Sequence, residues 1–409
     1  MRKPILTIFY PFNPWHSNKN RIQTIICSFI KYAPDNFEVR LVGIGKETSL
    51  TGVWQDTEFA GRSLKFMSLI TLGSDEVLDT NSLATKYTAG LIGRNLASDF
   101  MHFHRLEPSL SAYRWLGHKT LFIHDDIQSE INPEHSKNTI LWQTFPDAYF
   151  DLEKSIIDQF DRTYICYKRV LSFYQERYSQ IANRFTHLQN AVDTEIFQGI
   201  NSSQKTAKRQ ELVKNLNLSP ETKFILFTDS IHRLEDLLLL IHSCATLTET
   251  SYHLLILGKE KLDPVIQAEI NYLELSSRIT LLGEVEQQKL AELYHASNVF
   301  VLINVNENLP VAVLEALSCG TPIVTTNCGE TPKILSRDSG IVCQHRTPEA
   351  IGAALEQVLQ DSDDYPPDSC ISIVQPYAAS NVVQKVYEEM WQDWVQRQDE
   401  GIGNYRYSA

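Results

Sequence analysis

The chain has 409 residues, of which 43% are hydrophobic and 21% charged, and its formal net charge is −13. Because a chain of this length exceeds the usual size of one compact core, we expect two domains. The acidic balance argues against nucleic acid as a general partner and against an anionic membrane surface, since both require a basic face.

The cysteines and the N-terminal stretch indicate in which compartment of the cell the protein is expected. The seven cysteines are scattered without a closely spaced pair, which indicates reduced thiols in a cytoplasmic protein and no zinc site. The opening run "MRKPILTIFYPFNPW" is interrupted by proline, asparagine and tyrosine, so it does not resemble a signal peptide. No stretch reaches the ~18 apolar residues that a membrane span requires, and we expect no transmembrane segment.

Short β-branched or aromatic runs alternate with helical patterns along the chain, which predicts βα units on parallel sheets. The predicted strands are residues 5–10, 37–44, 100–104, 119–124, 162–167 and 185–190, then 223–228, 252–258, 278–283, 298–304 and 321–326. The predicted helices are residues 21–33, 234–247, 265–275, 287–297, 311–318 and 381–396. Two successive sets of this kind predict the α/β class with two doubly wound, Rossmann-like domains.

A polar cluster of serine, glutamine, lysine and asparagine within residues 190–223 predicts the domain boundary. We therefore expect an N-terminal domain over 1–205 and a C-terminal domain over 206–379. The acidic, proline-containing run 361–370 resembles a linker. The amphipathic helix within 380–409 is expected to pack back on the first domain or to pack on the second.

The stretch "INVNENLPVAVLEALSCGTPIV" places one glutamate inside a helix that is otherwise apolar. The pattern predicts a buried helix over Val311–Ser318, with Pro310 at its first position and Gly320 ending it. Glu315 is then buried and needs a partner. Two interpretations are open: an internal ion pair with a lysine or arginine, or hydrogen bonds from the hydroxyl groups of a ligand.

Glu307 favours the second interpretation, because it follows a buried strand at the sheet edge where ligands bind in open α/β folds. No serine, threonine or aspartate stands directly before Pro310. Unless the Asn308 side chain caps the helix, free N–H groups around Leu309 and Val311 point at the cleft and form a site for a phosphate. Two carboxylates beside such a helix end suit a sugar nucleotide.

The segment "ENLPVAVLE", followed by "ALSCGTPIVTTNCGETPKIL" and "SGIVC", resembles the Glu, seven residues, Glu motif region of the retaining glycosyltransferases of family 4. The upstream segment "LQNAVDTEIF" is also similar to that family, and the resemblance is strongest over about residues 185–342. It implies the GT-B fold, with two Rossmann-like domains facing across a cleft. The first domain would bind the acceptor and the second the nucleotide-sugar donor.

The resemblance also implies roles for individual residues. Glu307 would contact the transferred sugar, and Glu315 would accept hydrogen bonds from the ribose hydroxyls. The other implied donor-binding residues are Asn308, Leu309, Pro310 and Val311, whose backbone would hold the sugar and diphosphate, Gly283, Glu284 and Val285 beside the base, and Gly258 near the phosphates.

Two histidines of the first half end predicted strands, His104 in "FMHFHRLEP" and His124 in "KTLFIHDD". His124 matches the family's active-site histidine, which lies against the donor sugar. His104 is more simply interpreted as a structural hydrogen bonder, with a role on the acceptor or phosphate side as the alternative. Asp125 and Asp126 either orient His124, contact substrate or form a solvated turn.

Some positions differ from the family pattern. The glycine-rich loop expected after the first strand is replaced by "YPFNPWHSNKNRIQT", where Asn18, Lys19 and Arg21 form either an anion site or a solvated helix start. Of the two cations that usually grip the diphosphate, Ser230 stands at the position of the arginine and Arg233 near that of the lysine. Arg233 is therefore the expected diphosphate contact.

The leading hypothesis is a cytoplasmic, hexosyltransferase-like enzyme of glycan biosynthesis. It would move a sugar from a nucleotide diphosphate donor to a hydroxyl of a glycan, a lipid-linked acceptor or a small molecule. By resemblance it needs neither cofactor nor metal, and it acts as a homo-oligomer or in a transferase complex. The alternatives are a non-catalytic GT-B accessory subunit that partners an active transferase and, third, a nucleotide-sugar epimerase.

Overall fold

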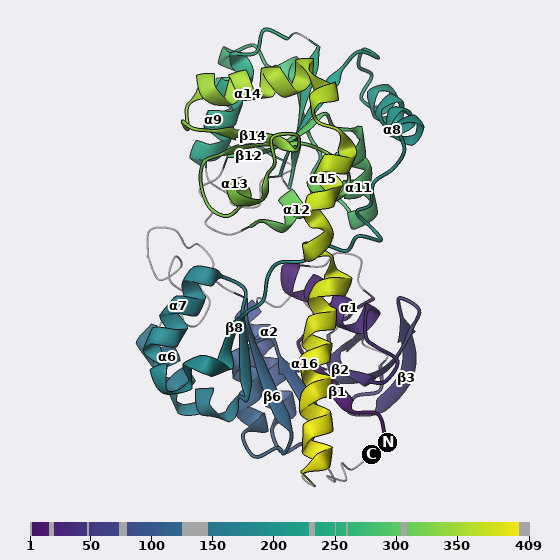
Figure 1. Ribbon diagram of the computed structural model, residues 1–409, viewed down its shortest axis with the longest axis vertical. Coiled ribbons are helices and arrows are strands. Elements are labelled where there is room, and N and C mark those ends of the chain that lie inside the picture. The colour runs from purple at the N-terminus through teal and green to yellow at the C-terminus, as the bar shows by residue number, and fades with distance from the viewer. Residues whose placement is uncertain are drawn as a thin grey trace. The chain divides into compact units, whose positions relative to one another are not determined.

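The computed structural model describes residues 2–15, 20–46, 49–72, 80–124, 146–228, 234–249, 251–258, 261–303 and 309–400. The chain divides into two compact units (Figure 1). The first comprises Met1–Gln189 and Val382–Ala409, and the second comprises Asn190–Asn381. Each unit is a mainly parallel sheet with helices on both faces, in agreement with the predicted α/β class.

The first unit is built on an eight-stranded sheet. In spatial order the strands are β3 (Trp54–Phe59), β4 (Arg62–Leu72), β2 (Glu38–Lys46), β1 (Ile5–Phe9), β5 (Phe100–Phe103), β6 (His118–Ile123), β7 (Arg162–Ile165) and β8 (Phe185–His187). Among the described strand pairs of this unit, only β3 and β4 are antiparallel. The strand order reverses between β1 and β5, and ligands of open α/β sheets bind at the carboxyl edge of such a switch point.

The hairpin of β3 and β4 was not among the predicted strands. Its first strand reads "WQDTEF" and is largely exposed, so it lacks the apolar run by which the buried strands are recognised. Ala60 and Gly61 form the connecting turn with φ values of 51° and 76°. Two successive positive φ angles are typical of the turns that close tight hairpins.

Helices cover both faces of the first sheet (Figure 1). One face packs against α2 (Thr80–Leu91), α3 (Leu106–Ser109), α6 (Pro146–Ile156) and α7 (Lys168–Arg177). The other face packs against α1 (Arg21–Lys31) and α16 (Ala379–Asp399), where the Phe29 ring contacts those of Phe122 and Tyr387. The aromatic residues of the strands are therefore buried on both faces.

The last helix, α16, belongs to the first unit from Val382 onward. The Tyr387 hydroxyl donates a hydrogen bond of 2.7 Å to the backbone oxygen of Phe29. Arg2 lies over the Trp394 ring at 4.7 Å from its centroid. The C-terminal helix thus covers the sheet that begins with the N-terminal strand.

The second unit is built on a six-stranded sheet whose described strand pairs are all parallel. In spatial order the strands are β11 (Ile279–Leu281), β10 (Tyr252–Leu257), β9 (Lys223–Thr228), β12 (Val299–Leu302), β13 (Ile323–Thr326) and β14 (Gly340–Cys343). This is the strand order of a dinucleotide-binding fold, with its switch point between β9 and β12. The end of β12 is therefore the expected ligand edge.

Two apolar cores flank this sheet. One face packs against α8 (Ser202–Asn215), α11 (Gln287–Ala296), α12 (Val311–Ser318) and α15 (Pro367–Val374). The other packs against α9 (Leu234–Ala245), α10 (Pro264–Tyr272) and α14 (Pro348–Gln360), and the short helix α13 (Thr331–Ile334) precedes β14. Short 3-10 turns of the two units lie at Leu110–Ala112, Ile157–Gln159, Ser179–Arg184, Ser276–Arg278, Ser362–Asp364 and Gln375–Tyr377.

The division between the units differs from the predicted boundary at residue 205. Residues after Gln189 already belong to the second unit, because Val192 and Phe197 are buried in its core. Run 361–370, predicted as a linker, is instead part of that unit and buries Cys370 completely. The polar sequence in both places predicted exposed segments. A few buried apolar residues, however, determine the unit against which each segment packs.

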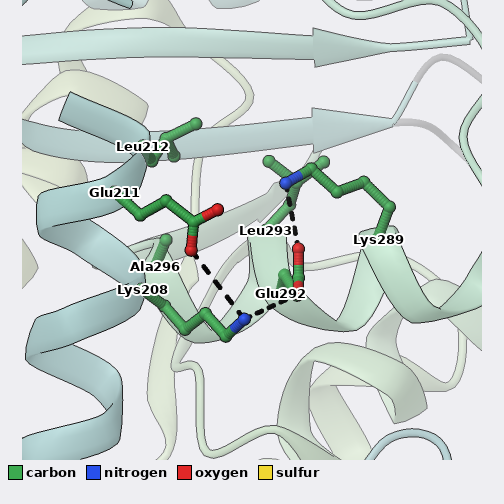
Figure 2. A pocket seen from close by; sticks show the side chains of 7 residues that line it. All are labelled: Lys208, Glu211, Leu212, Lys289, Glu292, Leu293 and Ala296. Atoms are coloured by element: carbon green, nitrogen blue, oxygen red, sulfur yellow. Dashed lines mark hydrogen bonds and ion pairs between the residues drawn. The ribbon is translucent and has the colours of Figure 1, made fainter. Parts of the chain in front are cut away.

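The contact of α8 with α11 is bordered by a surface cluster of charges (Figure 2). Lys208 approaches Glu292 at 2.6 Å, and Lys289 approaches the same carboxylate at 2.9 Å. The hollow between these side chains has a volume of about 10 Å³, which is room for about one water molecule. It is therefore too small to be a ligand site.

None of the helices in the described part of the chain combines the length and the apolar character needed to cross a membrane. None of the seven cysteines forms a disulfide bond, and five of them are buried.

Candidate functional site

Three neighbouring strands of the first unit bring polar side chains to one edge of the sheet. His104 follows β5, His124 follows β6, and Cys166 and Tyr167 follow β7. These strands are parallel neighbours in the order β5, β6, β7, so their carboxyl ends lie side by side. Sequence analysis predicted the two histidines at this edge but not the residues after β7.

The two histidines are in direct contact. His104 Nδ1 lies 2.9 Å from His124 Nε2, within hydrogen-bond distance. Their rings are nearly parallel, with an interplanar angle of 12° and centroids 5.2 Å apart. The other ring nitrogen of His124, Nδ1, lies 3.4 Å from the Cys166 sulfur. Both nitrogens of the predicted active-site histidine therefore have partners within the first unit.

Arg21 borders this histidine pair from the first turn of α1. Its guanidinium donates one hydrogen bond to the His124 carbonyl and another, of 2.9 Å, to the Tyr167 hydroxyl. Asn20 caps α1 by accepting from the Gln23 backbone, so the helix start that carries Arg21 is well defined. Sequence analysis left two roles open for Arg21, an anion site or a solvated helix start. In the structure its guanidinium is hydrogen-bonded to residues at the ends of β6 and β7.

Burial keeps both histidines neutral. Burial first, and then the positive charge of Arg21, lower the pKa of His124 to about 3. The pKa of His104 is also well below its ordinary value, because of burial and then the neighbouring His124. At neutral pH the pair thus consists of two uncharged imidazoles.

A pocket with a volume of about 50 Å³ opens beside the histidine pair. Its lining combines the two imidazoles, an arginine–glutamate ion pair, a tyrosine and apolar side chains. These are Ile22, His104, Arg105, Leu106, Glu107, Leu121, Phe122, Ile123, His124 and Tyr149. The mixture of aromatic, apolar and hydrogen-bonding groups is typical of sites that bind small polar molecules.

In the second unit the expected ligand edge is formed by the start of α12. The helix begins at Val311, and Pro310 precedes it with extended backbone angles and offers no side-chain cap. Pro310 therefore occupies the cap position rather than the predicted first helical position. Because its extended ψ of 144° is not helical, the helix can begin only at the next residue.

The chain that enters α12 is held by a residue from the domain boundary. The Asn190 side chain donates a hydrogen bond of 2.8 Å to the carbonyl of Leu309, whose side chain is buried in the core. Asn190 belongs to the family-like run "LQNAVDTEIF", but its partner could not be predicted from that run. The contact ties the chain directly before α12 to the segment that opens the second unit.

Glu315 lies one turn inside α12 and is partly buried. Its Oε2 accepts a hydrogen bond of 3.1 Å from the Tyr294 hydroxyl. Burial raises the pKa of the Glu315 carboxyl to about 7, and the Tyr294 bond opposes that shift. Among the described residues, no lysine or arginine is ion-paired with Glu315, so the first of the two sequence interpretations does not hold for this part of the chain.

The glycines predicted near the nucleotide lie at neighbouring strand ends. Gly258 follows β10 and donates a backbone hydrogen bond of 2.8 Å to Gly283, which follows β11. Their φ values are 96° and 60°, in the region that other residues rarely adopt. Beyond Gly283 the side chain of Glu284 is exposed, whereas Val285 packs against the core.

Arg346 is a basic residue of this edge that sequence analysis did not select. It follows β14, donates a hydrogen bond of 3.3 Å to the Ile303 carbonyl and forms an ion pair with Asp236 in the first turn of α9. Ile303 ends the β12 segment, so Arg346 joins the two sides of the switch point. No local signal marks it, because its partners lie 43 and 110 positions away in the chain.

The remaining predicted residues lie outside the described part of the chain. They are Glu307, Asn308, Arg233, Asn18, Lys19 and Asp125. Within the described ranges, no group of three or more His, Cys, Asp or Glu side chains is arranged to hold a metal ion.

The two-unit architecture, with a parallel sheet of Rossmann type in each unit, is the fold of the GT-B glycosyltransferases. Sucrose-phosphate synthase from Thermosynechococcus elongatus matches with a TM-score of 0.71 at 13% identity, over 96% of this chain and 100% of that chain. HepE from Anabaena in complex with UDP-glucose matches with a TM-score of 0.63 at 12% identity, over 95% of this chain and 100% of that chain. At this identity the likeness concerns the fold.

Sequence comparison gives a narrower match within the second unit. Residues 208–369 match the model of the family described as Glycosyl transferases group 1. A curated relative, N-acetyl-alpha-D-glucosaminyl L-malate synthase of Bacillus anthracis, is 24% identical over 37% of this chain. The match spans only 40% of that relative's own length. The residues matched by the family model lie within the second unit.

Proposed function

We propose that this protein is a retaining glycosyltransferase that moves a sugar from a nucleotide diphosphate donor to an acceptor hydroxyl. The observation that supports this most directly is the start of α12. A helix without a side-chain cap from Pro310 begins at the switch point of the second sheet, and a glutamate inside it has a tyrosine hydroxyl as its described partner. A phosphate suits the backbone amides at this helix start, and ribose hydroxyls suit the carboxylate.

The spacing along α12 fits one nucleotide. Glu315 lies four residues after Val311, which is roughly 6 Å along the helix axis. A diphosphate at the first amides and a ribose beside Glu315 are therefore compatible with a single ligand. In this proposal Gly258 and Gly283 let the backbone approach the phosphates and base closely, while Glu284 and Val285 flank the base.

The reaction develops positive charge at the anomeric carbon and negative charge on the departing diphosphate. We assign stabilisation of the sugar to Glu307 and His124, and stabilisation of the leaving group to Arg233 and the first amides of α12. No metal or cofactor is needed for this division of roles. Because His124 is neutral, it acts through hydrogen bonds rather than as an acid.

The acceptor is assigned to the first unit. Its pocket beside His104 and His124 presents imidazole, tyrosine and apolar groups, a composition that suits the hydroxyl groups of a glycan, a lipid-linked sugar or a small molecule. Asn18, Lys19 and Asp125 are assigned to the same side. Arg21 supports this side indirectly, through the ends of β6 and β7.

A donor-turnover assay over a panel of nucleotide sugars tests the proposal. The purified chain should hydrolyse or transfer at least one donor, and Glu307→Ala should lower kcat by about 10²–10³-fold, the usual effect of removing one transition-state contact. Glu221→Gln, at an exposed residue just before the amino end of β9, serves as the control and should change kcat much less. Turnover that is unaffected by Glu307→Ala would contradict the assignment.

The second candidate is a non-catalytic GT-B subunit that partners an active transferase. The specific observation in its favour is Ser230, which stands where the family usually has a diphosphate-binding arginine. In the same assay this candidate predicts donor binding without turnover. Formation of an isomeric nucleotide sugar would instead indicate the third candidate, an epimerase.

A further inference from the structure

We propose that His104 is a positioning residue that holds His124 as a neutral hydrogen-bond donor, with the ring proton of His124 on Nδ1. The inference rests on the proposed function, in which His124 contacts the donor sugar. It adds a defined chemical form of His124 and a residue that enforces it. In this form His124 has one N–H group to offer to a substrate, on Nδ1, which faces the Cys166 sulfur in this structure.

The geometry places three groups in a row. His104 Nδ1 is 2.9 Å from His124 Nε2, and His124 Nδ1 is 3.4 Å from Cys166 Sγ. The His104 ring is itself fixed by stacking on Phe122, with centroids 4.4 Å apart and an interplanar angle of 8°. His104 and His124 are 2% and 4% exposed, so neither ring has room to turn freely.

The unused nitrogen of His104 decides where the protons lie. His104 Nε2 is buried and has no hydrogen-bond partner among the described residues. A buried N–H group without a partner is rarer in proteins than a buried acceptor without one. We therefore place the His104 proton on Nδ1, from which it is donated to His124 Nε2.

The position of the His104 proton determines the tautomer of His124. A neutral imidazole carries one proton, on one of its two nitrogens. Since Nε2 of His124 accepts from His104, the proton of His124 is on Nδ1 and faces the Cys166 sulfur. The cationic form is disfavoured because the ring is buried and Arg21 lies beside it.

A ligand atom can replace the sulfur as the hydrogen-bond acceptor of the His124 Nδ1 proton. Thiol sulfur is a weak hydrogen-bond acceptor, so an oxygen of the donor sugar that approaches Nδ1 would form a stronger bond than Cys166 does. His124 cannot serve as a general base in this arrangement, because its free electron pair is used by His104. Its contribution is to orient an oxygen of the sugar.

The chain offers a matched control in His102. This residue lies two positions earlier, on the same face of β5, and is 0% exposed. Both of its ring nitrogens lack a hydrogen-bond partner among the described residues. Replacing it removes a buried histidine that also contacts Phe122, while both partners of the His104–His124 hydrogen bond stay in place.

The kinetic experiment compares three variants with the wild type, using the donor found in the panel assay. His104→Leu should lower kcat by about 10–10²-fold, with a smaller change in donor KM, as expected when a reacting group loses its orientation. His104→Asn should recover most of that loss, because its amide nitrogen occupies about the place of Nδ1 and donates. His102→Leu should leave kcat within a few-fold of wild type.

The spectroscopic experiment does not depend on activity. The ring nitrogens of ¹⁵N-histidine-labelled protein are observed by NMR, and the His124 signals are assigned by their loss in His124→Asn. The wild type should show His124 protonated on Nδ1. In His104→Leu the proton should move to Nε2, the form that a neutral histidine prefers in water.

Three results would overturn the inference. The first is a wild-type His124 protonated on Nε2, and the second is an unchanged kcat in His104→Leu. The third is an equal kcat loss in His104→Leu and His102→Leu that follows their melting temperatures, which would make both residues merely structural. If the wild type turns over no donor, the proposed function fails, while the NMR result still decides the form of His124.

Discussion

Glu315 shows how one carboxyl group can report on ligand binding. Burial raises its pKa to about 7, so that a substantial part of it is protonated at neutral pH. An ionised carboxylate accepts hydrogen bonds from both hydroxyls of a ribose, whereas a protonated carboxyl must use one oxygen as a donor. Ligand binding should therefore favour the ionised form and release a proton.

We predict that donor affinity falls with decreasing pH below about 7. The folded pKa is above the ordinary 4.5, so protonation stabilises the free protein, fully below about pH 4.5, and this contribution is lost as the pH rises through about 7. Donor affinity follows the opposite course and drops by at most about tenfold per pH unit below 7.

Calorimetric titration with a nucleotide sugar, whose diphosphate does not titrate in this range, measures the effect. Glu315→Gln should bind more weakly and show no pH dependence between about pH 5.5 and 8. Equal affinity of the wild type at both ends of this range would show that Glu315 does not contact the ligand.

At the scale of elements, Arg346 connects the ends of two strands with a helix of the second unit. It leaves the end of β14 and reaches the carbonyl of Ile303, which follows β12, and the Asp236 carboxylate in α9. The segments that carry Glu307 and Arg233 begin and end beside these two partners in the sequence. Arg346 thus fixes the points at which both segments leave the described core.

We predict that Arg346→Met lowers both stability and donor affinity. Asp236 is 4% exposed, and removing the partner of a buried carboxylate is costly, so the free energy of unfolding should fall by roughly 1–3 kcal/mol. Lys289→Met, which removes a cation from the surface cluster of Figure 2, is the control and should cost less than about 1 kcal/mol.

Urea denaturation and donor titration of both variants measure these effects. If Arg346→Met lowers the free energy of unfolding and the donor affinity no more than Lys289→Met does, the ion pair with Asp236 has no special role at this edge.

The whole chain is organised so that its last helix completes its first unit. Helix α16 covers the aromatic face of the first sheet through Tyr387 and Trp394, although the residues directly before it belong to the second unit. Tyr387 is 1% exposed and packs against the rings of Phe29 and Phe37. Stability of the first unit should therefore depend on residues near the C-terminus.

We predict that Tyr387→Ala destabilises the first unit by about 3–5 kcal/mol, because it leaves a large cavity. Tyr387→Phe retains the ring and loses the hydrogen bond to Phe29, so it should cost about 1–2 kcal/mol. Hydrogen exchange measured by mass spectrometry should show the loss of protection in peptides of Met1–Gln189. Comparable loss throughout Asn190–Asn381 would contradict the assignment of α16 to the first unit.

Much of the fold follows from local patterns. The buried strands of both sheets and the bounds of α12, Val311–Ser318, were predicted because strand and helix periods repeat over a few residues. The strand β3 was missed because its residues are polar and largely exposed, which leaves little periodic signal. The strands β4 and β14 were also missed, although β4 has 11 residues and buries several apolar side chains.

The candidate site, like the fold, could be predicted from the sequence only in part. His124 and Glu315 could be selected from the sequence, because their places after a strand and inside an apolar helix are local facts. Their partners could not be, since His104 meets His124, Asn190 meets Leu309 and Tyr294 meets Glu315 only through strand order and helix packing. The sequence by itself thus determined that His124 ends a strand and that Glu315 lies inside an apolar helix. Tertiary structure decided their protonation and orientation, because both depend on neighbours that are distant in the chain.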